Sequence, residues 1–261
     1  MLLSDVFFMS LKVLLSRSLL DIKVPSISLI FSLLTPLSLT PSSLQWFEEK
    51  QAWMEQLDGQ LRKLHGSVES LIHHRKELTA ATGQLAKGTA ILGNCEEQNS
   101  LSCALSQLAA TQEKIEKVYE RQTAADFALL CELLKDYIAL IGSVREAFSW
   151  RAKAFQALAA TELALSRKRE QKGRLQMAMK TERVPPLEEE IRQWEAKVEK
   201  AREDCQTVSG NIKTEFERFE GNRIRDFKRN FLAYMESLLM TQEALVQSWE
   251  GFLPEAKSIV V

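Results

Sequence analysis

Residues 57–92, which decide the fold, read LDGQLRKLHGSVESLIHHRKELTAATGQLAKGTAIL. Apolar residues recur in this stretch at alternating spacings of three and four, as they do in a coiled-coil helix. No proline interrupts the pattern, and Gly93 follows it, where a glycine commonly ends a helix. The stretch therefore predicts a long helix with one apolar seam, made of Leu57, Leu61, Leu64, Val68, Leu71, Leu78, Leu85 and Leu92.

Two further long helices are predicted around this stretch. The first helix begins at the S-x-x-Q capping box of residues 42–45, and the second runs from Leu101 without a proline until Pro185. At about 1.5 Å per residue, some seventy residues of the second helix make a rod of roughly 100 Å. The third opens at Pro185 and is expected to stop at Gly251 and Pro254. Short connections favour antiparallel neighbours, so we expect an all-α, elongated antiparallel three-helix coiled coil.

Two segments are too apolar for a three-helix monomer to cover. Residues 79–92 carry one charge, Lys87, and residues 127–144 are apolar on two faces. A helix that is apolar all round is buried on more than one side. We therefore expect a dimer; the alternative is that residues 1–40 cover these faces. The predicted dimer interface comprises Ala81, Leu85, Ala90, Leu92, Leu130, Leu134, Ile138 and Ile141.

A basic cluster follows the second helix in a chain whose formal net charge is only -1. Each Lys or Arg close to an anionic leaflet contributes about 1 kcal/mol of binding. We expect the two copies of the cluster in a dimer to bind acidic membrane, although a solvated charge run remains the alternative. Nucleic acid is disfavoured because no known nucleic-acid-binding motif accompanies the cluster. The predicted membrane-binding residues are Arg167, Lys168, Arg169, Lys172, Arg174, Lys180 and Arg183.

The first residues differ abruptly in composition from the rest of the chain. Residues 24–44 carry no charge and are about long enough to span a bilayer, but several prolines and serines weaken that interpretation. Asp5 stands where a secretory signal would be basic. We expect residues 1–42 to be an atypical hydrophobic and Ser-rich extension, either poorly ordered or an alternative or misassigned start, and residues 43–261 to form the helical domain.

The sequence shows no catalytic pattern. It contains no glycine-rich phosphate loop, no G-x-S-x-G elbow and no HExxH motif, so we expect neither an enzyme nor a cofactor. His73 and His74 are adjacent and expected to point to different sides, so no metal site is predicted. The four cysteines form no CxxC pair, which favours packing roles in a reducing cytoplasm.

Several segments, in order, resemble the C-terminal BAR domain of the retromer-associated sorting nexins of types one and two. They include WFEEK at Trp46, LLKDYIALIGSVREAF at Leu133, EIRQWEAKV at Glu190 and FLPEAK at Phe252. The resemblance runs from about Ser43 to the end of the chain. It is the resemblance that implies the endosomal setting: a cytoplasmic, peripheral membrane protein that forms homodimers or heterodimers with other sorting nexins and senses or imposes curvature.

The same resemblance implies retrograde, retromer-linked transport and phosphoinositide-containing membranes. A Phox domain and an amphipathic helix normally precede this region, and residues 1–40 stand in their place. Two hypotheses therefore stay open. The chain is a curvature-binding membrane scaffold, or it is a coiled-coil adaptor that dimerises with full-length sorting nexins without binding membrane itself.

Overall fold

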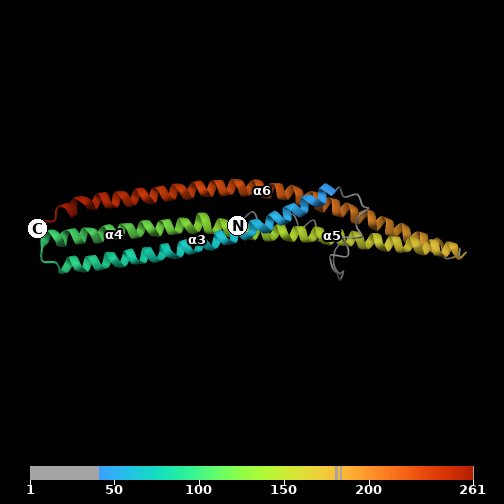
Figure 1. The fold of residues 1–261 in the computed structure, drawn as a ribbon, viewed down its shortest axis with the longest axis horizontal. Helices are drawn as coiled ribbons and strands as arrows, with labels where there is room; N and C mark the ends of the chain where they lie inside the picture. The colour runs from blue at the N-terminus through green and yellow to red at the C-terminus, as the bar shows by residue number, and fades with distance from the viewer. Residues whose placement is uncertain (1–40, 180–181, 183, 261) are drawn as a thin grey trace. The chain divides into compact units, whose positions relative to one another are not determined.

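The structure is a computed structural model that describes residues 41–179, 182 and 184–260. Its helices are α3 (Pro41–Cys95), α4 (Asn99–Ala125), the π-helix η1 (Asp126–Cys131), α5 (Glu132–Met177) and α6 (Val184–Lys257). Figure 1 labels α3, α4, α5 and α6. The described residues contain no strand. The expected all-α class with three long helical segments is confirmed, since α4, η1 and α5 follow one another without a break. The expectations for residues 1–40 lie outside the described residues.

The helix boundaries differ in detail from those expected. α3 begins at Pro41, in the first turn, where the missing N–H of proline breaks no helical bond. We had expected α6 to stop at Gly251 and Pro254, and this expectation is wrong, because α6 continues to Lys257. A proline so close to a helix end removes only one backbone bond, and the N–H of Ser258 still donates to the carbonyl of Pro254 at 3.1 Å.

The turn between α3 and α4 is tight. The Oγ of Ser102 donates to the carbonyl of Gly93 at 2.6 Å, and the Gln98 side chain caps α4 by accepting from the N–H of Leu101. A Cβ atom on Gly93 would lie 3.3 Å from the Ser102 carbonyl oxygen and 3.1 Å from the Cβ of Leu105. A larger residue than Gly93 would push the start of α4 away by a few tenths of an ångström, so glycine favours the close approach; its φ is not positive.

The chain divides into two compact units. Unit 1 contains the described residues up to Glu55 together with Leu140–Glu220, and unit 2 contains Gln56–Ala139 together with Gly221–Val261. In unit 1 the core is aromatic near Phe216, which is 2% exposed. Its ring lies 5.5 Å from Trp46 and 6.2 Å from Phe148, so α3, α5 and α6 all contribute. Further along α5 and α6 the core becomes aliphatic, with Ala154, Leu158, Leu165, Leu187, Ile191 and Val198.

In unit 2 the helices lie side by side and antiparallel (Figure 1). Gly93 contacts Ser102, Arg75 contacts Asp126 and His65 contacts Cys131, so residue numbers rise on α3 while they fall on its neighbour. The expected seam of α3 is largely wrong: Leu61 and Val68 are buried, but the other leucines from Leu64 onward are exposed. The seam that α3 buries inside the chain is made of Leu61, Val68, Ile72, Thr79, Thr82, Ala86 and Thr89.

Small side chains explain why the threonine and alanine row faces inward. They allow neighbouring helices to approach closely, and their hydroxyls need not be left unsatisfied. The Oγ1 of Thr79 donates to the carbonyl of Arg75 at 2.7 Å, and that of Thr82 to the carbonyl of Leu78 at 2.8 Å. The buried hydroxyls of Thr79 and Thr82 are thus paired within their own helix, and the larger leucines are left on the outside.

Candidate functional site

The basic end of α5 lies against the acidic start of α6 in unit 1. The Nζ of Lys168 is 2.5 Å from Glu190 Oε2, and the Nζ of Lys172 is 2.7 Å from Glu188 Oε1. An Nη atom of Arg169 lies 2.7 Å from Glu195. Glu188 and Glu190 follow the first turn of α6, which begins at Val184 and contains no acidic residue itself.

The predicted membrane-binding residues therefore differ in whether their charge is already paired with a carboxylate of the same chain. Three of them, Lys168, Arg169 and Lys172, are engaged with α6. Arg174 lies 3.9 Å from Glu170 and is 83% exposed. Arg167 is exposed and forms no ion pair among the described residues. Lys180 and Arg183 lie outside the described residues. Exposed ion pairs of this kind are worth only about 0–1 kcal/mol, so an anionic surface could compete with them.

Two methionines stand out at the same end and were missed by the sequence reasoning. Met177 is 89% exposed and Met179 is 88% exposed. Met179 has a φ of 54°, in the left-handed region. The sequence did contain a signal for them, because both methionines stand within a run of charged residues. Exposed apolar side chains beside cations combine the two features that favour membrane surfaces.

The eight predicted dimer-interface residues also separate by burial. Ala81, Leu85 and Leu92 are exposed, while Ala90, Leu130 and Ile138 are half-buried. Leu134 and Ile141 are 1% and 0% exposed, so their side chains belong to the core of the single chain and offer nothing to a second one. Both residues are buried because they lie on α5, which packs against both α3 and α6.

Unit 2 instead exposes two apolar rows. The leucine row of α3 repeats every seven residues and is 37% to 65% exposed, and it consists of Leu64, Leu71, Leu78, Leu85 and Leu92 with Ile91 beside it. The apolar row of α6 consists of Ile224, Phe231, Met235, Leu239, Val246, Trp249 and Leu253, each 43% or more exposed. Exposed apolar rows are typical of surfaces that associate with another protein.

The comparisons with known proteins agree with this architecture. The family described as "Vps5 C terminal like" matches residues 42–255. The chain belongs to this family. Sorting nexin-2 of Homo sapiens is 48% identical to this Vps5 C-terminal-like chain over 214 residues, which are 82% of the chain and 41% of the relative. Sorting nexin-1 of Homo sapiens is 44% identical over 214 residues, which are again 82% of this chain and 41% of the relative. The expected relationship to sorting nexins is therefore confirmed, and the chain spans about two fifths of these relatives' length.

Solved structures extend the comparison to the fold. The N-terminal I-BAR domain of D.Discoideum IBARa aligns with a TM-score of 0.50 over 84% of this chain and 91% of that chain, at 11% identity. At that identity the likeness shows the fold alone. It supports a BAR-type helical arrangement for this Vps5 C-terminal-like chain.

A search for membrane spans gives a separate result. None of the helices in the described part of the chain is both long and apolar enough to cross a bilayer.

Proposed function

We propose that this chain is a dimeric scaffold that binds acidic membranes in endosomal sorting, in the manner its sorting nexin relatives suggest. The observation that carries the proposal is the outward leucine row of α3, which has the seven-residue spacing of a helix seam and is exposed among the described residues. The apolar row of α6 adds a second surface to cover in unit 2. We propose that a second copy of this region, or the same region of a sorting nexin, covers these two rows.

The membrane part of the proposal depends on the end of α5. Arg167 and Arg174 are exposed, and Met177 and Met179 stand beside them with almost fully exposed side chains. Cations attract anionic headgroups, and the methionines could enter the boundary between headgroups and acyl chains. A dimer would present two such ends to one surface, so that the second contact strengthens the first. Retrograde transport with retromer is the wider setting we propose.

The second candidate function is a coiled-coil adaptor that dimerises with full-length sorting nexins without holding membrane. The observation that favours it is the pairing of Lys168, Arg169 and Lys172 with carboxylates of α6. Residues 167–197 contain nine Lys and Arg and six Glu, so the local excess of positive charge is smaller than the cluster alone suggests.

Light scattering tests the dimer. The double variant Leu78→Glu, Leu85→Glu should shift the full chain from dimer to monomer, because it buries unpaired carboxylates in an apolar interface. Ala80→Glu, Gln84→Glu adds the same charge at exposed positions away from the leucine row and should leave the dimer intact. A dimer in both variants would place the interface elsewhere.

Vesicle sedimentation decides between the scaffold and the adaptor. The chain should sediment with anionic vesicles, not with neutral ones, and binding should fall as salt is raised, because exposed charges are screened over about 8 Å at physiological ionic strength. Arg167→Glu, Arg174→Glu should weaken binding at least about tenfold, at roughly 1 kcal/mol per cation. Lys114→Glu, Lys117→Glu, an equal charge reversal in unit 2, is the control. A chain that dimerises but never sediments with anionic vesicles supports the adaptor.

A further inference from the structure

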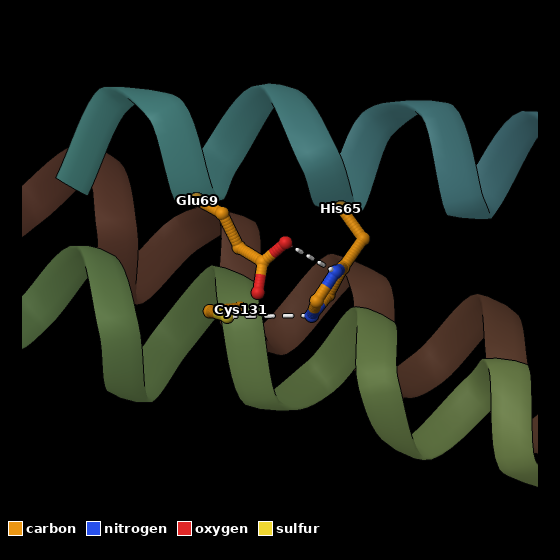
Figure 2. Close-up of side chains that lie close together, drawn as sticks. All are labelled: His65, Glu69 and Cys131. Carbon is orange, nitrogen blue, oxygen red and sulfur yellow. Dashed lines mark hydrogen bonds and ion pairs between the residues drawn. The ribbon is translucent and has the colours of Figure 1, made fainter. Parts of the chain in front are cut away.

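Three potential metal ligands come together in unit 2, as Figure 2 shows. His65 and Glu69 lie one turn apart on α3, and Cys131 is the last residue of the π-helix η1. The Nε2 of His65 is 3.5 Å from the Sγ of Cys131, and its Nδ1 is 3.4 Å from Oε2 of Glu69. The ligand atoms that the three residues offer all lie within 4.8 Å of one another.

Solvent exposure increases across the cluster, from the buried thiol of Cys131 to the exposed carboxylate of Glu69. Cys131 is 5% exposed, whereas the side chains of His65 and Glu69 are 20% and 61% exposed. A ligand can therefore enter from the Glu69 side and reach a thiol that is otherwise shielded. Cys131 is the last residue of the π-helix η1, and π-helical turns occur frequently at functional sites. His65 and Cys131 are 66 positions apart in the sequence and are in contact.

The spacing fits a tetrahedral metal. Zinc binds cysteine sulfur at about 2.3 Å and histidine nitrogen at about 2.0–2.1 Å, so two such ligands at a tetrahedral angle lie about 3.5 Å apart. The distance between His65 Nε2 and Cys131 Sγ has this value, 3.5 Å. A set of one nitrogen, one sulfur and one carboxylate oxygen is within the range of zinc ligands and leaves one position for water.

We propose that His65, Glu69 and Cys131 bind one Zn²⁺ ion, which ties α3 to the central helix of unit 2. His65 and Cys131 supply the two ligands that are already in place. The exposed Glu69 side chain supplies the third by a small rotation. This site is independent of membrane binding and of the dimer, because it lies on neither the leucine row nor the basic end of α5.

A second cluster on α3 serves as a comparison. His73 and His74 lie 3.3 Å and 3.0 Å from the two carboxylate oxygens of Glu77, so the expectation that they point to different sides is wrong. All three side chains are exposed and come from one helix. The cluster has no sulfur ligand and nothing to shield a metal, so we base no site on it.

Cobalt titration of the full chain tests the proposal. Co²⁺ substitutes for zinc, and a cysteine ligand produces a thiolate-to-cobalt absorption band in the near ultraviolet. We expect one Co²⁺ per chain with this band, displaced by Zn²⁺. Cys131→Ser and His65→Gln should abolish the band or weaken binding at least tenfold, while Cys103→Ser and His73→Gln should leave it unchanged. Circular dichroism of each variant shows that it is folded.

Other outcomes overturn the assignment. A chain that shows no thiolate band at saturating Co²⁺ has no such site. A band that survives Cys131→Ser but disappears in Cys103→Ser belongs to an exposed thiol. An unchanged cobalt affinity in Glu69→Gln removes Glu69 from the ligand set. As a second readout, Zn²⁺ should raise the melting temperature of the parent chain and not that of Cys131→Ser.

Discussion

Arg75 and Asp126 form an ion pair inside unit 2, with 2.6 Å between Arg75 Nε and Asp126 Oδ2 and no solvent exposure at the aspartate. The Nε2 of Gln122 donates to the other oxygen of Asp126 at 2.8 Å. The hydroxyls of Thr241 and Ser237 donate to Oε1 of Gln122 at 2.8 Å and 3.2 Å. The network thus joins α3, α4, η1 and α6, and a one-turn slip of any helix would leave buried polar groups unpaired.

Removing one partner of this pair should be strongly destabilising. Asp126→Ala leaves Arg75 without its partner, and we expect the free energy of unfolding to fall by about 3–5 kcal/mol in urea titration. Arg75→Met, Asp126→Leu removes both groups and should recover part of that loss. Asp136→Ala, at an exposed position nearby, should change stability by less than about 0.5 kcal/mol. A double variant as unstable as Asp126→Ala would show that the pair itself is not what matters.

Arg151 is the opposite case, a buried cation without a carboxylate partner among the described residues. It is 9% exposed, its guanidinium lies 3.6 Å from the Phe47 ring centre and 4.5 Å from that of Phe155, and it donates to Ser209. Burial lowers its pKa to about 10. Arg151→Met should therefore preserve or raise the melting temperature, since it fills the space without a charge.

Arg151→Ala is the matched comparison. It removes the charge but also leaves a cavity beside Phe47, and it should lower the free energy of unfolding by about 2 kcal/mol or more. If Arg151→Met were as damaging as Arg151→Ala, the contacts of the cation with the two rings would outweigh its desolvation.

The four cysteines should divide into two reactive and two protected thiols. Cys95 and Cys103 are exposed, whereas Cys131 and Cys205 are buried. Burial raises the pKa of Cys205 to about 11, so little thiolate is present at pH 8. Alkylation of the native chain followed by mass spectrometry should modify Cys95 and Cys103 quickly. Labelling of Cys205 should increase as pH approaches 11 and should become complete in denaturant; equal rates at all four would contradict the burial.

The two methionines at the end of α5 should contribute to membrane affinity. Met177→Ser, Met179→Ser removes apolar surface that is exposed in the free chain, so folding stability should change little while sedimentation with anionic vesicles decreases several-fold. Ala178→Ser, at an exposed position between them, is the control. If the double variant sedimented as well as the parent chain, the methionines would contribute nothing and membrane binding would be electrostatic only.

The helices and their order follow from the sequence alone, because the three-four periodicity and the prolines are local signals. The family followed from the resemblance of segments such as WFEEK at Trp46 and FLPEAK at Phe252. The sequence could not determine which row of α3 faces inward. Leu78 and Thr79 are adjacent, and each lies in a row with seven-residue spacing: Leu71, Leu78 and Leu85 form one, and Ile72, Thr79 and Ala86 form the other. Hydrophobicity favours the leucine row, yet packing at close range selected the row with small side chains and left the leucines outside. That choice depends on neighbouring helices and not on the helix itself.

The same limit applies to charges and ligands. The cations of α5 are evident in the sequence, but Glu190 and Glu195 meet Lys168 and Arg169 only because α6 returns antiparallel beside α5. His65 and Cys131 meet because of a helix register that includes a π-helix, for which residues 126–131 give no recognisable signal. Pairings between distant residues depend on register, and register is set by the packing of the whole unit, so only the tertiary structure decided which groups share a site.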